Sequence, residues 1–219
     1  MSSRHHHLRH GDRTGPAGPL RAVVATVTVL AVLALAAFPA RDVLYTAVAG
    51  STEASALGTT AGLVAEDGLY VLLAAAGVLA VLAWLRDRRA FWVLVAGGAG
   101  TVVAYAVSET VKLLVTEERP CRALTVETVL ACPPAGDWSW PSNHSVLAAA
   151  CATACVLAVP RSGWFVVPVA ALVAGSRVAA GVHYVHDVLA GAALGVLVVA
   201  VAVVVALARP LVGRLAPAG

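Results

Sequence analysis

The sequence predicts an all-α membrane protein, a bundle of six transmembrane helices. Of its 219 residues, 60% are hydrophobic and 12% are charged, and the mean hydropathy is +0.86. A soluble domain carries about 25% charged residues. The apolar residues also gather into runs of about 20, the length that crosses a bilayer as a helix. Polar and basic residues separate these runs, and the length suits one bundle without a second domain.

The N-terminal part begins with a polar segment and then an apolar run. Residues 1–19 contain basic residues, glycine and proline, so we expect a disordered cytoplasmic tail. The membrane domain then extends over residues 20–213, and its first helix is expected over residues 20–40. Residues 41–67 are mixed in character. We expect a loop there, with room for a short interfacial helix around residues 43–57.

The later apolar runs each end at a polar break. The second ends at the basic turn Arg86–Arg89, and the third leads into a polar loop over residues 116–142 that contains four prolines. Proline and clustered polar residues end helices, so these breaks separate the elements. We expect further helices over residues 68–85, 90–115, 143–160, 164–177 and 184–208.

Lysine and arginine are unevenly distributed. Of the 15, ten lie in the N-terminal tail, the 86–89 turn, the turn at Arg161 and the C-terminal segment. The positive-inside rule places these segments and both termini in the cytoplasm, and it places the 116–142 loop outside. The basic segments flank apolar spans, so we expect membrane lipids as neighbours and not nucleic acid. The composition suggests a bacterial plasma membrane and leaves the oligomeric state open.

The four cysteines divide into two pairs. Cys121 and Cys132 lie in the 116–142 loop, and a loop that faces an oxidising compartment would allow them to form a disulfide. Cys151 and Cys155 lie in an alanine-rich run and are expected to pack as small apolar residues.

Two polar clusters flank the 116–142 loop. In the first, Lys112 and Arg119 are seven residues apart, about 10 Å of rise on one face if the helix persists to Pro120. Arginine offers a planar fork to phosphate oxygens, and lysine offers a point charge. The alternative is a pair of cations that snorkel at a helix end.

The second cluster is Pro141-Ser142-Asn143-His144, where the loop enters an apolar run. Ser142 or Asn143 can cap the new helix, and the free N–H groups at its start form an anion site. A histidine in this first turn would lie beside the anion. The alternative is an ordinary capped helix with an interfacial histidine.

The third cluster contains Arg177, His183 and Asp187. His183 and Asp187 are four residues apart, so a helix would place them on one face. A carboxylate that accepts from one ring nitrogen leaves the other nitrogen basic and free to attack. The alternative is a His–Asp pair that anchors a helix end. His186 is rotated about 100° from Asp187 on a helix, and we expect it to face elsewhere.

Together the clusters place residues suited to phosphate binding on one membrane face. The three alternatives, snorkelling cations, a capped helix and a His–Asp anchor, do not explain why all three clusters lie on the same face. The clusters resemble the three signature motifs of the type 2 phosphatidic acid phosphatase superfamily, over residues 112–195. Its membrane branch includes undecaprenyl-pyrophosphate, phosphatidylglycerophosphate and eukaryotic lipid phosphate phosphatases. The family's second motif is usually Pro-Ser-Gly-His, and here Asn143 replaces glycine. We expect this to be tolerated, because asparagine imitates glycine where φ is positive.

The resemblance implies a phosphatase that acts on a lipid phosphate or polyprenyl diphosphate. His183 would be the nucleophile that becomes phosphohistidine, Asp187 would orient it, and His144 would protonate the leaving oxygen. Five residues would hold the phosphate: Lys112, Arg119, Ser142, Asn143 and Arg177. We expect no metal or other cofactor, because three cations can stabilise the phosphoryl charge and Glu117-Glu118 reads as a solvated loop pair.

Two other functions remain open at this point. One is a phosphotransferase that passes the phosphoryl group to an acceptor other than water. The other is a non-catalytic lipid-binding or transport protein of the same fold, against which the intact His144, His183 and Asp187 weigh. The clusters do not distinguish a monophosphate from a diphosphate, and they do not identify the lipid.

Overall fold

The computed structural model describes residues 17–215, and every regular element within this range is helical. Most of the expected tail lies outside the described residues, but residues 17–19 belong to the first turn of a helix. The long helices are α1 (Ala17–Ala37), α3 (Leu57–Arg86), α4 (Arg88–Val115), α6 (Asn143–Ala158), α7 (Gly163–Ala179) and α8 (Val185–Leu215). The short elements are α2 (Arg41–Glu53), α5 (Pro120–Ala123) and the 3₁₀ turns η1 (Phe38–Ala40) and η2 (Pro160–Ser162).

The six long helices correspond to the six apolar runs of the sequence. By length and composition, five segments are long and apolar enough to cross a membrane, and α6 is a shorter apolar helix between two of them. The six-helix bundle predicted from hydropathy is therefore confirmed as the fold.

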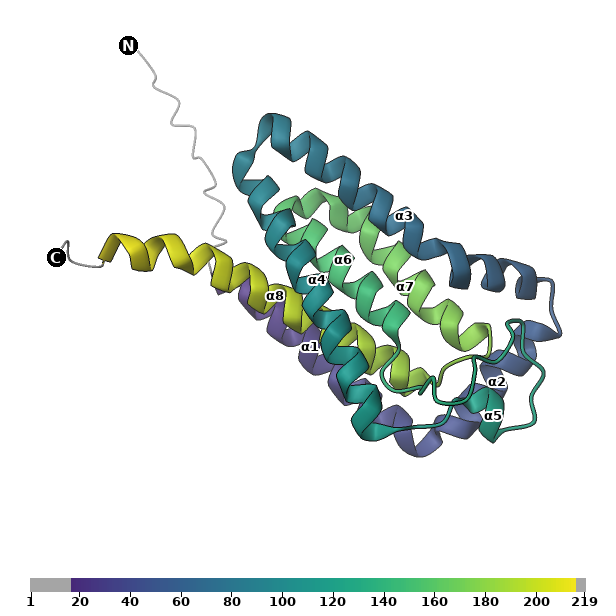
Figure 1. Cartoon of the computed structure of the whole chain (residues 1–219). Coiled ribbons are helices and arrows are strands. Elements are labelled where there is room, and N and C mark those ends of the chain that lie inside the picture. The colour runs from purple at the N-terminus through teal and green to yellow at the C-terminus, as the bar shows by residue number, and fades with distance from the viewer. Residues whose placement is uncertain (1–16, 216–219) are drawn as a thin grey trace, which may run out of the picture.

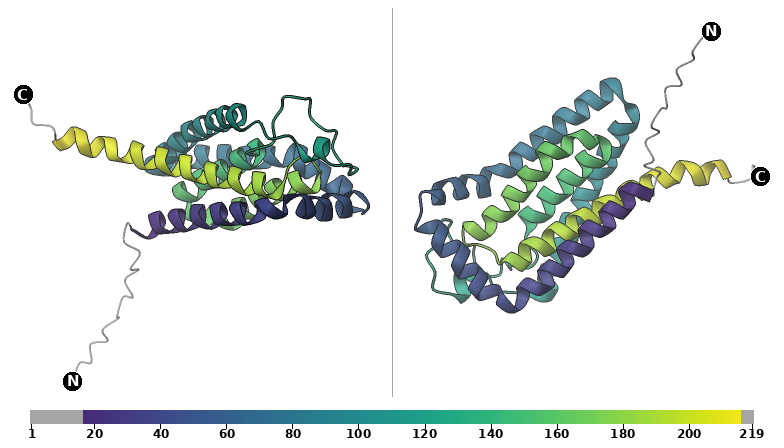
Figure 2. Two further views of the ribbon diagram at one scale, coloured as in Figure 1. Left: turned by 90° about the horizontal axis from the view of Figure 1, so that it is seen from below. Right: turned by 180° about the vertical axis from the view of Figure 1, so that it is seen from behind.

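The helices surround α6. This helix packs against α3, α4, α7 and α8, while α1 lies lengthwise along α8 (Figures 1 and 2). The short helices α2 and α5 and the long loop before α6 gather at one end of the bundle (Figure 1). The last turns of α4 and α7 and the first turns of α6 and α8 meet there, so the three polar clusters are brought to the same end.

The prediction for residues 41–67 was partly wrong. The short helix expected there is α2, but α3 already begins at Leu57, about three turns earlier than hydropathy indicated. The added turns pack on the polar loop: a Cβ built on Gly62 would lie 3.2 Å from Val129. Glycine and threonine made this segment look like a loop, whereas tertiary contact keeps it helical.

Close packing between α6 and α8 fixes the loop end of the bundle. A Cβ built on Gly191 would lie 2.6 Å from the carbonyl oxygen of Ser142, so only glycine allows this approach. The backbone N–H of Ser142 donates to the carbonyl of Asp187 at 3.1 Å. The second and third clusters are therefore joined through the backbone.

Candidate active site

Residues from five segments converge at the loop end of the bundle. Lys112 lies in the last turn of α4, and Arg119 immediately precedes α5. His144 lies in the first turn of α6, Arg177 in the last turn of α7, and Asp187 in the first turn of α8. Lys112, Arg119 and Arg177 are all buried. Three buried cations near one another predict an anionic ligand.

The turn between α7 and α8 presents His183. Gly181 has φ +86°, a left-handed conformation that glycine adopts without strain. Its carbonyl accepts a hydrogen bond of 3.0 Å from the hydroxyl of Tyr45 in α2. The N–H of Val182 donates to the carbonyl of Arg177 at 3.1 Å, so the turn also closes on α7. The turn that carries His183 is thus held from two helices, by the Tyr45 side chain of α2 and by the backbone of α7.

His183 and Asp187 contact each other, but not as a pair on one helical face. Because α8 begins at Val185, His183 lies outside the helix. Asp187 Oδ2 reaches back to accept from the N–H of Tyr184 at 2.8 Å, and it lies 3.3 Å from His183 Nδ1. Ser139 Oγ donates to the same oxygen at 2.5 Å. The carboxylate acts as a cap of α8 and holds the imidazole at the same time.

The other ring nitrogen of His183 faces a cation. His183 Nε2 lies 3.0 Å from Arg119 Nη1, which also donates to the carbonyl of Val182 at 2.9 Å. The network assigns the ring proton to Nδ1, facing Asp187, and leaves a lone pair on Nε2. Burial, and then the neighbouring cations led by Arg119, hold the pKa of His183 well below its usual range. At neutral pH the imidazole is therefore uncharged and able to attack.

A carboxylate from the loop forms ion pairs with two of the three cations. Asp137 Oδ1 lies 2.9 Å from Arg119 Nη2 and 3.4 Å from Lys112 Nζ, and the Asp137 side chain remains 45% exposed. Burial favours a higher pKa for Asp137, but the hydrogen bond and charge of Arg119, aided by Lys112, outweigh it and lower the pKa. An ionised oxygen thus pairs with both cations, as the oxygen of a bound anion would. Asp137 carried no motif signal in the sequence.

Arg177 is held by the first turns of α3, the segment that hydropathy predicted to be a loop. Its Nη1 donates to the carbonyl of Ala65 at 2.9 Å, while its Nε has no partner among the described residues. This contact fixes one end of the guanidinium and leaves its buried Nε–H without a partner among the described residues. His144 lies in the electrostatic field of Arg177, Arg119 and Lys112, so it belongs to the same site.

Ser142 and Asn143 occupy the start of α6 in different ways. Ser142 is the N-cap residue, but its side chain makes no cap bond, and its buried Oγ has no partner among the described residues. Asn143 has helical backbone geometry, so the expectation of a positive φ is wrong. Its side chain instead accepts from Ser108 Oγ at 2.7 Å and donates to Glu109 at 2.6 Å, tying α6 to α4. Asparagine therefore fits because it has partners in α4.

His186 and Glu117 also depart from their predicted positions. His186 is buried beside Asp187, with Nε2 3.1 Å from Asp187 Oδ1 and 3.1 Å from Glu117 Oε2. Glu117 is therefore a partner of this histidine and not part of a solvated pair. The three side chains place ligand atoms within 4.8 Å of one another, a spacing that a metal ion could occupy. The imidazole lies between the two carboxylates and is hydrogen-bonded to Glu117, whereas Asp187 Oδ1 has no hydrogen-bond partner among the described residues.

A disulfide shapes the loop between the first two clusters. Cys121 and Cys132 are joined in the structure, and Arg122 donates to the carbonyl of Pro133 beside this link. The loop then returns to the cations, where the N–H of Ser139 donates to the carbonyl of Glu117 at 2.8 Å. Asp137 and Ser139 reach the site from this returning part of the loop.

The comparisons with known proteins agree with this geometry. The PAP2 superfamily model matches residues 93–210, more than half of the chain and all three clusters. The chain belongs to the PAP2 superfamily.

This chain is also similar in sequence to curated proteins and similar in fold to a solved structure. A decaprenylphosphoryl-5-phosphoribose phosphatase of Mycobacterium tuberculosis is 35% identical over 60% of this chain and 68% of its own length. An undecaprenyl-diphosphatase of Bacillus subtilis is 34% identical over 60% of this chain and 65% of its own length. A transmembrane PAP2-type phosphatidylglycerolphosphate phosphatase from Bacillus subtilis has the same fold, with a TM-score of 0.57 at 19% identity. That alignment covers 91% of this chain and 98% of the other.

Proposed function

We propose that this PAP2 protein is a membrane phosphatase that hydrolyses a lipid phosphate or polyprenyl diphosphate through a phosphohistidine intermediate. The observation that carries the proposal is the setting of His183. One ring nitrogen faces the buried Asp187, and the other lies 3.0 Å from Arg119, among cations suited to a phosphate. The curated relatives support the substrate class, because they are named as phosphatases of decaprenyl and undecaprenyl lipids.

In the first step, the lone pair of His183 Nε2 attacks phosphorus. The N–P bond forms as the P–O bond to the leaving group breaks. His144, which takes up a proton when the anionic substrate binds beside it, gives that proton to the departing oxygen. Asp187 accepts the Nδ1 hydrogen bond and stabilises the positive charge that develops on the ring. Arg119, which contacts Nε2 in the empty site, turns with the other cations to the phosphoryl oxygens.

In the second step, water attacks phosphorus and the N–P bond breaks. His144, now neutral, takes a proton from this water, and inorganic phosphate leaves. With a diphosphate substrate, the lipid product is a monophosphate. Lys112 and the two arginines neutralise the spreading charge in both steps, so the reaction we propose requires no metal ion.

We place the site on the extracytoplasmic side, on the basis of charge. The turn Arg86–Arg89 lies between α3 and α4, at the ends of these helices remote from the polar loop. If the positive-inside rule holds for this turn, the loop and the catalytic residues face outward. Substrate would then bind from the outer leaflet, with its phosphate at the interface.

The test is phosphate release by the purified protein in EDTA, with undecaprenyl diphosphate and phosphatidic acid as substrates. We expect turnover to persist without metal, and His183→Ala to lower it by at least about 10³-fold. A radiolabelled terminal phosphate should label wild-type protein in an acid-labile, base-stable form, and His183→Ala should not be labelled. Full turnover by His183→Ala, or loss of wild-type turnover in EDTA, would contradict the proposal. Phosphate appearing on an added alcohol and not in water would indicate a phosphotransferase.

A further inference from the structure

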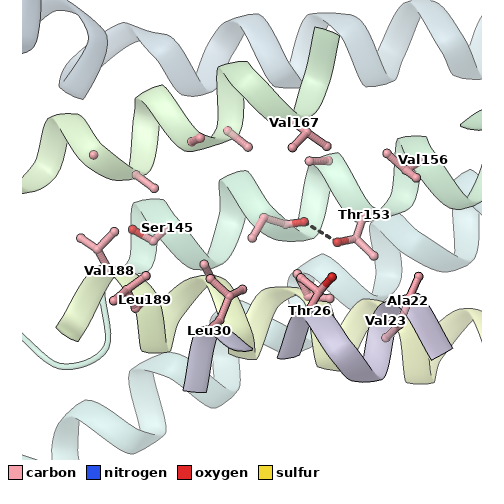
Figure 3. Close-up of a pocket in the computed structure, with 18 of the residues that line it drawn as sticks. Ala22, Val23, Thr26, Leu30, Ser145, Thr153, Val156, Val167, Val188 and Leu189 are labelled. Atoms are coloured by element: carbon pink, nitrogen blue, oxygen red, sulfur yellow. Dashed lines mark hydrogen bonds between the residues drawn. The ribbon is translucent and has the colours of Figure 1, made fainter. Parts of the chain in front are cut away.

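A long apolar groove extends into the bundle from the catalytic end. It has a volume of about 890 Å³ and lies between α1 and α7, with α6 and α8 as its floor (Figure 3). It exists because α1 packs lengthwise on α8, whereas α7 packs on α3 and α6. None of the described residues that line it is charged.

One end of the groove adjoins three site residues. It is lined there by Ser145, Val178 and Val188, the immediate neighbours of His144, Arg177 and Asp187 in the sequence. Figure 3 shows Ser145, Val188 and Leu189 together at this end. Along α6 the lining continues to Leu157, twelve residues on or about 18 Å of helical rise. That length is more than half of a hydrocarbon core of about 30 Å.

The polar groups of the groove differ in whether they have partners. Thr153, toward the far end, donates to the carbonyl of Ala149 within its own helix at 2.7 Å (Figure 3). Ser145, at the catalytic end, is fully buried, and its Oγ has no partner among the described residues. Because no part of Ser145 is exposed, a ligand in the groove would not reach this hydroxyl, and the contact at this end of the groove is apolar.

The walls are built from small side chains. α6 and α7 contribute Ala149, Ala152, Ala170, Ala171, Ala174 and Gly175. At Gly175 an added Cβ would meet nothing within 4 Å, so this position opens directly onto the free space. A larger residue there would narrow the groove without disturbing a packed neighbour.

We infer that this groove binds the polyprenyl chain of the substrate, with the phosphate end of the lipid at Ser145, Val178 and Val188. The inference rests on the proposed function and specifies where the lipid lies. The groove offers uncharged, mostly apolar contact over its length, and one of its ends adjoins the residues that hold the phosphate. The polyprenyl chain of the lipid would extend along α6, away from His144 and toward the cytoplasmic half of the membrane.

The test narrows the groove at Gly175 and compares two substrates. Gly175→Leu and Gly175→Trp should lower kcat/KM for undecaprenyl diphosphate by about tenfold or more, increasing with side-chain size. Hydrolysis of water-soluble p-nitrophenyl phosphate should stay within about twofold, because its small leaving group leaves the groove empty. The matched controls are Gly98→Leu and Gly98→Trp, at an exposed glycine of α4 where an added Cβ also meets nothing within 4 Å. These controls gain the same helix propensity without touching the groove.

A second measurement does not depend on turnover. An undecaprenyl phosphate analogue with a photoactivatable group in its chain, bound to the His183→Ala variant, should crosslink to α6 and α7 along the groove. Crosslinks confined to α3 and α4, or equal losses for the Gly175 and Gly98 variants, would overturn the inference. So would a loss at Gly175 for phosphatidic acid but not for the polyprenyl substrate. If wild-type protein releases no phosphate from any substrate, the proposed function fails, whereas active wild type with an unaffected Gly175→Trp rejects the groove alone.

Discussion

At the scale of the residue, the carboxylate of Asp187 is divided between two histidines. Oδ2 lies 3.3 Å from His183 and also accepts from Ser139 and the backbone of Tyr184, whereas Oδ1 lies 3.1 Å from His186. Glu117 competes for the same nitrogen of His186 at 3.1 Å. One N–H cannot satisfy two carboxylates fully, so Glu117 limits how strongly His186 binds Asp187.

Removing the charge of Glu117 should weaken catalysis through this chain of contacts. In Glu117→Gln, the neutral amide oxygen accepts from His186 more weakly than the carboxylate does. The imidazole would then shift toward Asp187 Oδ1 and draw negative charge away from the oxygen that faces His183. We expect kcat for undecaprenyl diphosphate to fall about tenfold with KM within about twofold. The neighbouring exposed Glu118→Gln is the matched control and should behave as wild type. Equal kinetics for the two variants would show that His186 and Glu117 have no positioning role.

His183 also makes stability depend on pH. Its folded-state pKa is lowered well below 6.5 by burial and by the neighbouring cations. Between that folded value and 6.5 the unfolded chain binds the additional proton, so stability is complete above about pH 6.5 and is lost as the pH falls. The loss approaches about 1.4 kcal/mol per pH unit. In detergent, the Tm of wild type should therefore fall more steeply between pH 6.5 and 5 than that of His183→Asn. Parallel curves for the two proteins would contradict this.

At the scale of the element, the early start of α3 has a direct effect on the site. The turns before residue 68 supply Ala65, whose carbonyl accepts from Arg177 at 2.9 Å. The same turns pack on the loop that carries Asp137 and Ser139, with Gly62 against Val129. One short helical segment thus supports a cation and the loop together.

A side chain at Gly62 should therefore disturb phosphate binding. Gly62→Leu would press on Val129, because even its Cβ would lie 3.2 Å away. We expect KM for the lipid phosphate to rise about threefold to tenfold. Gly77→Leu, in the same helix at a position where an added Cβ meets nothing within 4 Å, should leave KM unchanged. An unaltered KM in Gly62→Leu would mean that the loop does not depend on this contact.

At the scale of the whole molecule, the candidate catalytic residues and the basic turn Arg86–Arg89 lie at opposite ends of the bundle. The polar clusters, α2, α5 and the disulfide-linked loop lie at one end, and the Arg86–Arg89 turn lies at the other (Figure 1). The apolar groove joins the catalytic end to the middle of the bundle. A lipid phosphate can then meet the cations at the interface while its chain stays in the membrane.

Labelling of single cysteines in intact cells tests this orientation. Glu118→Cys lies in the loop and Arg88→Cys in the opposite turn, and both native side chains are exposed. The native Cys121 and Cys132 are joined, and Cys151 and Cys155 are buried, so they give little background. A membrane-impermeant maleimide should label Glu118→Cys at once and Arg88→Cys only after permeabilisation. The reverse pattern would place the site in the cytoplasm.

The sequence by itself determined the six apolar helices, the membership of the PAP2 superfamily and the set of phosphate-suited residues. Hydropathy and motif spacing are local properties, so they can be read along the chain. Only the tertiary structure decided that Asp137 contacts Arg119, that His186 lies against Asp187, and that α3 begins at Leu57. It also decided where the groove lies. These features depend on contacts between segments far apart in the chain, and a one-dimensional pattern carries no record of which segments meet.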